Sequence, residues 1–346
     1  MRTTKKLTSL FLALLFALST SGCGSKQNVS SDVTNSKAGS SASSAAAQSE
    51  KTVAVAALKG PTGLSMAKLM DDSKSKKTKV NYNISLVSSP DEMVSMITGG
   101  KADAAALPTN LAAALYNKTS GNVRMAAVTT LGVLYLLTSG EDISSIKDLK
   151  GKTVYLTGRG ATPEYAFDYI LKQNGLTAGS DVKTVYESEH AGLAAKMIAG
   201  SVKIAVLPEP FVTQVLMKNK DVKRSLDITE EWDKASGGES VLSMGCLVVS
   251  KKFAAENKGT LDTFLDEYKA SVSYADTNTE ETAALSEKYG IMQKTVAEKA
   301  IPNCGIVYID GDEMQSKIPA FLQILYKANP KSIGGKLPDD NFYYKK

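Results

Sequence analysis

The pattern of hydrophobic and polar positions repeats once along the chain, after about a hundred residues. SMITGGKADAAALPTN at 95–110 and AKMIAGSVKIAVLPEP at 195–210 share one design. In each, a short helix ends at a glycine, and a small apolar strand follows and stops at Leu-Pro. The alignment pairs Gly99 with Gly200 and needs a one-residue gap before the two Leu-Pro ends coincide. Since both strands are apolar throughout, we expect them to be covered on both faces, as in a parallel sheet.

Another strand, turn and helix precede each copy of this repeat. They are TVAVAALKGPTGLSMAKLM in the first copy and KTVYLTGRGATPEYAFDYIL in the second. In the second helix, Pro163 suits the first turn and Gly175 suits the C-terminal cap. An apolar stripe marks one face of that helix, at Ala166, Phe167, Ile170 and Leu171. Each half is therefore predicted to be a β-α-β-α-β unit with a right-handed parallel sheet.

The chain is expected to cross from the first half to the second and to return. VRMAAVTTLGVLYLLTS leads into the second unit, and SMGCLVVSKKF is typical of a strand that leads back. The C-terminal third is helical by pattern and is expected to complete the first lobe. We predict an α/β fold of two lobes, each a parallel-rich sheet flanked by helices, with a cleft between them. Lobe 1 takes residues 51–138 and 247–346, and lobe 2 takes residues 139–246.

The first fifty residues have a different character. Arg2, Lys5 and Lys6 precede the apolar run 10–18, which is far shorter than the ~20 residues that span a bilayer. This arrangement predicts an export signal over residues 1–22. The small residues before Cys23 resemble the lipobox of bacterial lipoproteins, although Thr20 stands where that family usually has leucine. The resemblance implies lipidation of Cys23; a freely secreted protein with an unmodified thiol is the alternative.

A tether and two further cysteines follow from this interpretation. Residues 24–50 are rich in serine and alanine and lack an apolar period, so we expect Cys23 and this disordered segment to anchor the folded part. With Cys23 lipidated, Cys246 and Cys304 remain in an oxidising compartment. A disulfide between them and a pair of buried free thiols both fit the sequence.

Charge and histidine content exclude several classes of function. Loss of the three positive charges in residues 1–22 lowers the net charge from +5 to +2, so we expect no nucleic-acid partner. His190 is the single histidine, which rules out a multi-histidine metal site, and we expect it to be a polar residue at a helix start. We predict no enzyme activity, no metal and no cofactor. GRGATP lacks the third glycine of a dinucleotide-binding loop.

Ligands of parallel sheets bind beyond the carboxyl ends of the strands, which nominates four turns. They are 59–63, 108–110, 158–162 and 208–210. Backbone N–H groups at the starts of the helices would serve as donors. The candidate ligand-binding residues are Pro61, Thr62, Thr109, Asn110, Arg159, Gly160, Ala161, Thr162 and Glu209.

Three of these candidates have a second interpretation. Glu209 either accepts a hydrogen bond from an amine or ring N–H of the ligand or serves as a loop acid or backbone cap. Arg159 either pairs with an anionic ligand or with Glu209, or lies on the surface. Asn110 either contacts the ligand or caps the next helix.

Six segments together carry a likeness to one known family: LKGPTG at 58–63, DLKGK at 148–152, GRGATPEYAF at 158–167, LPEPFVT at 207–213, IPNCGIVYIDGDEM at 301–314 and ANPKSIGGKLPDD at 328–340. Their combination resembles the type II periplasmic binding proteins of ABC importers, in the SsuA/Thi5-like (NitT/TauT) branch. It implies a monomeric receptor that is lipid-anchored at the extracytoplasmic face of the cell membrane. Such a receptor binds a sulfonate, a pyrimidine or thiamine-precursor-like molecule, or a similar solute, and delivers it to the permease and ATPase complex.

Two other classes of protein stay open at this stage. Relatives of this fold include enzymes of thiamine-pyrimidine and menaquinone biosynthesis, and a surface lipoprotein without a transport role would share the N-terminal pattern. The identity of the solute and the residues that contact the permease are left undetermined by the sequence.

Overall fold

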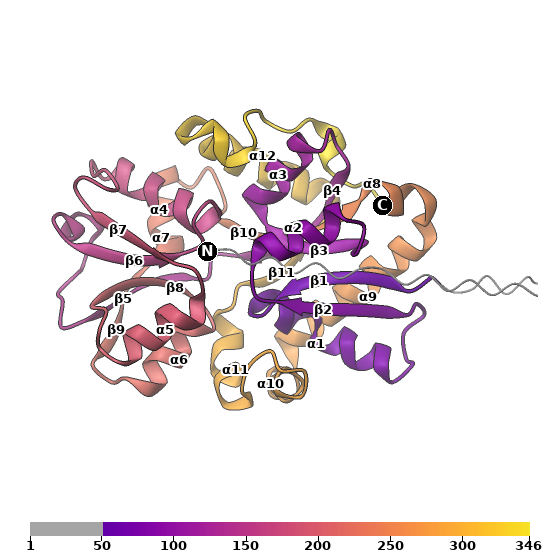
Figure 1. Ribbon diagram of the computed structural model, residues 1–346, viewed down its shortest axis with the longest axis horizontal. Helices are drawn as coiled ribbons and strands as arrows, with labels where there is room; N and C mark the ends of the chain where they lie inside the picture. The colour runs from indigo at the N-terminus through magenta and orange to yellow at the C-terminus, as the bar shows by residue number, and fades with distance from the viewer. Residues whose placement is uncertain (1–50) are drawn as a thin grey trace, which may run out of the picture. The chain divides into compact units, whose positions relative to one another are not determined.

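The strands form two separate sheets in the computed structural model, which describes residues 51–346. The first sheet has six strands in the order β11-β4-β10-β3-β1-β2, and the second has five in the order β7-β6-β8-β5-β9 (Figure 1). The strands of the first are β1 (Val53–Leu58), β2 (Tyr82–Val87), β3 (Ala104–Pro108), β4 (Val123–Leu131), β10 (Ser243–Ser250) and β11 (Ile306–Ile309). Those of the second are β5 (Leu134–Ser139), β6 (Thr153–Thr157), β7 (Lys183–Glu187), β8 (Ile204–Pro208) and β9 (Val222–Asp227).

Helices flank both sheets. Those that connect strands of the first sheet are α1 (Pro61–Lys74), α2 (Pro90–Thr98) and α3 (Thr109–Lys118). Those that accompany the second are α4 (Thr162–Gln173), α5 (His190–Ile198), α6 (Phe211–Lys218) and α7 (Ile228–Ser236). The C-terminal third adds α8 (Lys251–Glu256), α9 (Lys258–Thr277), α10 (Thr279–Lys288), α11 (Lys294–Ala300) and α12 (Gly311–Ala328), and short 3-10 turns occur at Ile146–Leu149, Ile301–Asn303, Pro330–Ile333 and Asp340–Phe342. The predicted α/β class with two helix-flanked sheets is confirmed.

Both sheets contain the predicted β-α-β-α-β unit. β1 pairs in parallel with β2 and β3, and β6 pairs in parallel with β7 and β8. Apolar strands such as AAALP and IAVLP are buried along nearly their whole length, as expected for strands covered on both faces. β10 and β5 then insert antiparallel beside β3 and β8, so each sheet is mixed.

The one-residue gap in the repeat alignment is wrong. α2 begins at Pro90 and α5 at His190, and the residues with positive φ that follow these helices are Gly100 and Gly200. The repeat is therefore a hundred residues long throughout. The alignment by sequence pairs Ile97 with Ile198, because both follow a methionine. In the structure the buried residue that corresponds to Ile97 is Met197 instead.

The chain changes sheets between β4 and β5 and again before β10. The predicted boundaries at 138/139 and 246/247 fall inside β5 and β10, since β5 pairs with β8 and β9 and β10 pairs with β3 and β4. The hydrophobic pattern does not show where the chain leaves the first sheet, because the apolar run continues from β4 into β5. Gly132 marks it instead, with φ +67° and its Cα packed so closely that a Cβ would lie 2.6 Å from the Thr229 Oγ1.

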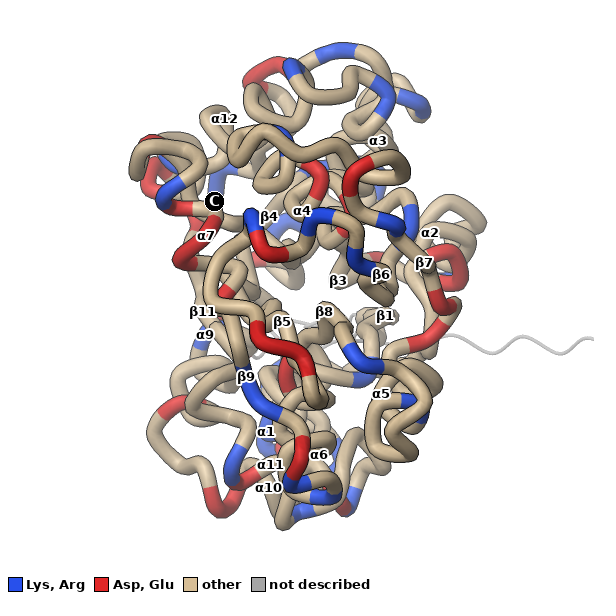
Figure 2. Tube along the Cα trace, turned by 90° about the vertical axis from the view of Figure 1, so that its left-hand side faces the viewer, with Lys and Arg blue, Asp and Glu red and all other residues tan. Residues whose placement is uncertain are grey.

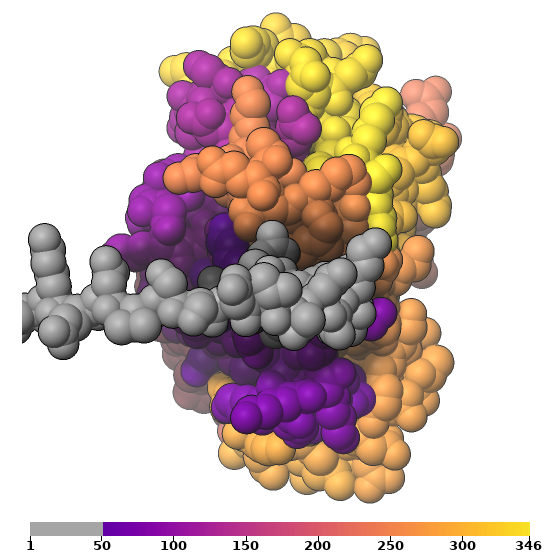
Figure 3. Space-filling model, turned by 90° about the vertical axis from the view of Figure 1, so that its right-hand side faces the viewer, coloured from indigo at the N-terminus to yellow at the C-terminus, as the bar shows by residue number. Residues whose placement is uncertain are grey.

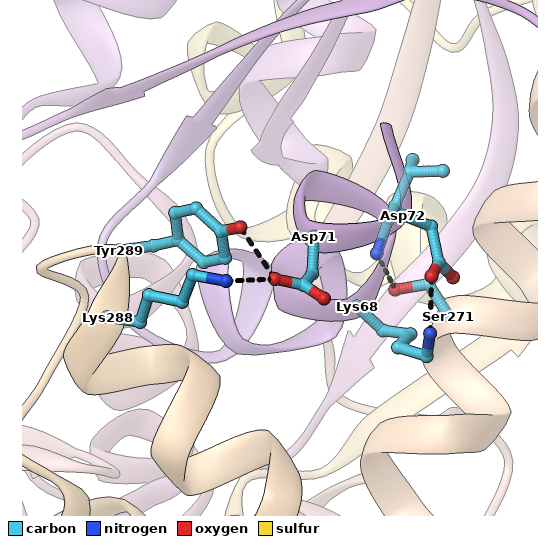
Figure 4. A network of polar contacts seen from close by, with 7 residues as sticks. Lys68, Asp71, Asp72, Ser271, Lys288 and Tyr289 are labelled. Atoms are coloured by element: carbon cyan, nitrogen blue, oxygen red, sulfur yellow. Dashed lines mark hydrogen bonds and ion pairs between the residues drawn. The ribbon is translucent and has the colours of Figure 1, made fainter. Parts of the chain in front are cut away.

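Helices of the C-terminal third pack on the first lobe. Asp71 of α1 accepts hydrogen bonds from Lys288 Nζ (2.5 Å) and from the Tyr289 hydroxyl (2.8 Å) (Figure 4). Ser271 of α9 accepts from the Leu69 N–H over 3.1 Å. Figure 3 shows the result on one face, where N-terminal residues (indigo to purple) and C-terminal residues (orange to yellow) form a shared surface.

The C-terminal third also contacts the second lobe, which the sequence pattern did not indicate. α12 also packs against the second lobe, where the Phe321 and Trp232 rings lie 5.6 Å apart between centroids. Trp232 is fully buried, and its indole N–H donates to the Ser240 carbonyl over 3.0 Å. One hydrophobic cluster therefore contains residues of both sheets together with buried residues of α12.

Charges of both signs are interspersed over the molecule. Figure 2 shows lysine and arginine positions alternating with aspartate and glutamate positions around the second sheet. Within residues 51–346, no helix combines the length and the apolar character that crossing a membrane requires.

Candidate ligand site between the two sheets

A cavity of about 110 Å³ lies between the two lobes, at the carboxyl ends of their parallel strands. Each of the four predicted turns contributes to its wall. Five of the chain's ten prolines line it, namely Pro61, Pro90, Pro108, Pro163 and Pro208. Proline lacks an N–H donor, and its side chain is a rigid apolar ring. These five positions therefore make the wall rigid and largely apolar.

Several helix N-termini meet at this cavity. The lining includes the first residues of α1, α2, α5 and α6 and the residue that precedes α4, and such ends carry partial positive charge. Two of the donors predicted at the start of α4 are already used within their own turn. The Gly160 N–H donates to the Glu164 carboxylate (2.5 Å), and the Ala161 N–H donates to the Gly158 carbonyl (3.0 Å). The expectation of free N–H groups at these two positions is therefore wrong.

The predicted ligand residues divide into two groups. Pro61, Thr62, Ala161 and Glu209 line the cavity, whereas Thr109, Asn110, Arg159, Gly160 and Thr162 do not. Thr62 Oγ1 donates to the Leu58 carbonyl over 3.0 Å, which fixes this hydroxyl at the edge of the cavity. The part that these four residues take in binding stays a prediction.

The polar residues at the start of α3 are buried in contacts within the protein. Thr109 Oγ1 lies 2.8 Å from the Ser243 hydroxyl of β10. Asn110 Nδ2 donates to the Gly160 carbonyl (3.2 Å) and to the Ser332 carbonyl (3.1 Å), and Asn110 Oδ1 accepts from the Thr162 hydroxyl (3.1 Å). These side chains hold the two lobes and the C-terminal segment together instead of facing the cavity.

Glu209 serves as a backbone cap, which is one of the roles considered for it, and it pairs with an arginine that the sequence did not nominate. Its carboxylate is fully buried and caps α6 by accepting from the Thr213 N–H (2.9 Å) and the Thr213 hydroxyl (3.1 Å). Arg224 of β9 donates to it over 2.7 Å and lies 4.0 Å from the centre of the Tyr135 ring. Burial raises the pKa of Glu209, although the bonds to Thr213 and the charge of Arg224 act in the opposite direction.

Arg159 lies on the outside of the second lobe. Its guanidinium carbon is 5.6 Å from the centre of the Tyr186 ring, and it borders a separate pocket with Glu164 and Asp168. The residue that pairs with Glu209 is Arg224, so the proposed Arg159–Glu209 contact is wrong. The two glycines around Arg159, with φ of +76° and +74°, turn the loop so that Arg159 points away while Ala161 lines the cavity.

His190 is a lining residue that the sequence did not nominate as part of the site. Its Nδ1 lies 2.6 Å from the Thr157 hydroxyl, and its ring packs against Phe211 at 5.4 Å between centroids. Burial lowers the pKa of His190 to about 4, so the ring is neutral at pH 7. The signal that could have found it is the repeat, because His190 is the counterpart of Pro90, which also lines the cavity.

The two segments where the chain changes sheets supply further lining residues. They are Thr130, Val133, Leu134, Met244 and Gly245. Val133 has φ +80°, an unusual conformation for a β-branched residue, and its carbonyl accepts the Glu209 N–H over 2.9 Å. This hydrogen bond links the connection between β4 and β5 directly to Glu209 at the cavity wall.

The cysteines correspond to the second of the two alternatives. Cys246 and Cys304 are both buried free thiols, so no disulfide joins them. Burial raises the pKa of Cys246 to about 12 and also raises that of Cys304, which keeps both protonated. Cys23 and the predicted signal and tether lie outside the described residues.

A family model described as "ABC transporter, phosphonate, periplasmic substrate-binding protein" matches residues 66–297. The chain belongs to this family. No curated protein sequence matches it. Members of the family are solute-binding components of ABC importers rather than enzymes, and they deliver small solutes to a permease. Among residues 51–346, no group of three histidine, cysteine, aspartate or glutamate side chains is placed to hold a metal ion.

Solved structures show the same fold. An ABC transporter protein from Parabacteroides distasonis is 26% identical with a TM-score of 0.71, covering 85% of this receptor and 99% of that chain. The periplasmic aliphatic sulphonate binding protein SsuA from Escherichia coli is 14% identical with a TM-score of 0.65, covering 85% and 92%. The periplasmic nitrate-binding protein NrtA from Synechocystis is 14% identical with a TM-score of 0.55, covering 76% and 74%.

Proposed function

We propose that this protein is a monomeric, lipid-anchored receptor that binds a small organic solute in the cavity between its lobes and presents it to an ABC permease. The observation that carries the proposal is the convergence of four turns, two from each sheet, on one largely apolar cavity. Concave apolar sites with a few polar groups are the usual form of small-molecule sites. Sulfonates and pyrimidine-like compounds are the solute classes that the sequence resemblance suggests.

Binding between the lobes couples the solute to their arrangement. A solute that contacts both walls stabilises the closed form, and a preference of about 5 kcal/mol moves a hinge from mostly open to mostly closed. The permease then distinguishes loaded from empty receptor by this arrangement. The narrow Leu131–Leu134 passage, which is bonded to Glu209 through Val133, is a suitable place for the movement.

Native mass spectrometry of protein purified without refolding is the first test, followed by a thermal-shift screen of sulfonates, pyrimidines, amines and aromatic acids. A solute at a hundred times its Kd adds about 2.7 kcal/mol of stability. Ala161→Asp, which puts a charge into the cavity wall, is expected to abolish that shift. Ala195→Asp, on the exposed side of α5, is the matched control and is expected to keep it. Equal shifts in both variants would place the site elsewhere.

The lipid anchor has a separate test in the full-length chain. Cys23→Ala is expected to move the protein from the membrane fraction to the medium and to abolish labelling by a palmitate analogue, while solute binding stays unchanged. Two chains on one cysteine are enough for stable anchoring, whereas one chain gives only marginal binding. Retention of the variant in membranes would contradict the anchor and leave the receptor function standing.

A further inference from the structure

The His190 side chain brings one free ring nitrogen to the cavity wall. Its Nδ1 lies 2.6 Å from the Thr157 hydroxyl, whereas its Nε2 has no hydrogen-bond partner within residues 51–346. Nε2 is not sealed from solvent, and the residue as a whole is only partly buried. Because His190 lines the cavity at the start of α5, this nitrogen is accessible to a molecule that enters there.

The Thr157 hydroxyl determines which ring nitrogen carries the proton. Thr157 is 2% exposed, and its hydroxyl has no other hydrogen-bond partner in the part of the chain that the structure describes. If Nδ1 carried the proton, the buried hydroxyl proton would have no acceptor, which costs about 1–3 kcal/mol. The hydroxyl therefore donates to Nδ1, and the ring proton lies on Nε2. His190 thus presents a neutral N–H donor to the cavity.

A second contact holds the ring in this orientation. Phe211 of α6 packs against the imidazole with 5.4 Å between the ring centroids and 39° between the ring planes. Because Thr157 holds one edge of the ring and Phe211 packs on it, the Nε2 donor is preorganised. Little conformational entropy is then lost when a solute accepts a hydrogen bond from it.

The surroundings of this donor favour a negatively charged acceptor. The first residues of α1, α5 and α6 line the same cavity, and the N-terminal ends of helices carry partial positive charge. Lys59 adds a full positive charge to the lining, while the charge of Glu209 is compensated by Arg224 at 2.7 Å. A hydrogen bond to an ionised oxygen is also stronger than one to an uncharged oxygen.

We propose that His190 selects the solute of this receptor by donating a hydrogen bond from Nε2 to an oxygen of a small oxyanion, and that Thr157 positions the ring for this bond. The inference rests on the proposed receptor function and adds a specificity-determining residue to it. At the matching place of the repeat, the first lobe has Pro90, which offers no side-chain donor. The acidic end of the solute therefore faces the second lobe.

NMR spectroscopy tests the donor directly. The chain contains one histidine, so selective labelling of histidine nitrogens gives ring signals from His190 alone. In the empty receptor at pH 7, we expect the ring proton on Nε2, and we expect its signal to move downfield when an oxyanion binds. Thr157→Val is expected to give a mixture of both tautomers, which a merely structural threonine would not cause. A proton on Nδ1 in the natural protein would overturn the proposed donor.

Calorimetric titration with four probes of similar size tests the acceptor. Propionate, ethanesulfonate and ethylphosphonate are the oxyanions, and propionamide is the uncharged comparison. The probes are small because the cavity of about 110 Å³ is smaller than an engineered protein cavity of about 150 Å³ that holds benzene. We expect the tightest oxyanion to bind at least tenfold more tightly than propionamide, and the order of the three identifies the type of oxyanion.

Two variants assign the effect to His190. His190→Leu removes the donor and keeps an apolar side chain, so we expect the tightest oxyanion to bind about tenfold more weakly, with a smaller loss for propionamide. His190→Gln places an amide N–H near the position of Nε2 and is expected to restore most of the affinity. Gln173→Leu, which removes a polar side chain at the exposed far end of α4, is the control and is expected to leave binding unchanged.

The outcomes separate this inference from the proposed function. Unchanged oxyanion binding in His190→Leu, or equal losses in His190→Leu and His190→Gln, would overturn the role of His190 while the receptor function stands. Propionamide binding as tight as that of the oxyanions would overturn the oxyanion class. If no probe binds but the purified protein carries a solute, an Nε2 signal that stays unchanged when this solute is removed would overturn the inference alone. A protein that binds no probe and carries no solute would overturn both.

Discussion

Thr162 at the start of α4 donates a hydrogen bond to Asn110 at the start of α3 over 3.1 Å, and this bond joins the two lobes next to the cavity. Both side chains are fully buried. Asn110 also donates to the carbonyls of Gly160 and Ser332, so one amide connects the first lobe, the second lobe and the C-terminal segment. Buried polar groups that satisfy one another in this way fix a single arrangement of the segments they join.

Asn110→Ala is expected to lower the free energy of unfolding by ~2–4 kcal/mol, because it leaves two carbonyls and the Thr162 hydroxyl without their partner. Thr162→Val removes only one of these bonds and keeps the side-chain shape, so we expect a loss of ~1 kcal/mol. Urea denaturation of both variants measures the difference. An Asn110→Ala variant no less stable than Thr162→Val would contradict the three-way role of this amide.

Arg224→Met is expected to destabilise the protein by about 2–3 kcal/mol at pH 8, because it leaves the fully buried Glu209 carboxylate without its cation. Without the positive charge of Arg224, ionisation of Glu209 costs more free energy, so its pKa is higher than in the natural protein. The loss is therefore expected to shrink as the pH falls towards 5 and the carboxylate takes up a proton. Thermal unfolding at both pH values measures this trend.

The double variant Arg224→Met, Glu209→Gln provides the control for that prediction. Because it removes the buried charge together with its partner, we expect it to be more stable than Arg224→Met alone at pH 8. A double variant that is less stable would show that Arg224 acts mainly through its contact with Tyr135.

The positions of the turns could be predicted from the sequence, because each lies where an apolar strand ends and a glycine or proline opens a helix. The continuous apolar runs at 104–108 and 204–208 identified parallel strands, and ligand sites of parallel sheets lie beyond their carboxyl ends. The fold class and the four turns around the cavity followed from these local patterns.

The directions of the side chains in those turns could not be predicted. Arg159 points outward because left-handed glycines on both sides rotate the loop, and Asn110 is buried because the C-terminal Ser332 returns to meet it from far along the chain. Thr130 and Gly245 reach the cavity only because β10 inserts beside β4. Such contacts depend on long-range packing, and no short sequence pattern reports them.

Asp168 of α4 is expected to make stability fall as the pH rises. Burial, with a smaller contribution from the charge of Glu164, raises its pKa from 3.8 to about 6, and its Oδ1 has no hydrogen-bond partner within residues 51–346. Between these two values the folded protein holds a proton that the unfolded chain has lost. The stability that Asp168 contributes is therefore complete below about pH 4 and is lost as the pH rises through about 6.

Asp168→Asn tests this sign. We expect a gain of ~1–2 kcal/mol at pH 7.5, after allowance for screening of the partly exposed side chain, and no gain at pH 4. Asp148→Asn is the control, and we expect it to change stability in the opposite direction, with a loss at pH 7.5. The Asp148 carboxylate accepts hydrogen bonds from the N–H groups of Ser144 and Ser145, and these bonds lower its pKa. A gain from Asp168→Asn that is equal at both pH values would contradict the titration of this carboxyl group.

Phe211 is expected to limit the length of the solute, because it borders two neighbouring spaces. It lines the cavity between the lobes and also an adjoining pocket of about 320 Å³. Lys59, Gln214 and Gln293 border this second pocket. Phe211→Ala is expected to connect the two spaces. A short neutral probe such as propionamide should then bind about tenfold more weakly through lost packing, whereas hexanamide, a longer neutral probe, should raise the Tm only in the variant. Phe211→Leu retains most of the side-chain volume and is expected to reject hexanamide as the natural protein does. Equal responses of the natural protein and Phe211→Ala to both amides would show that Phe211 does not separate the two spaces.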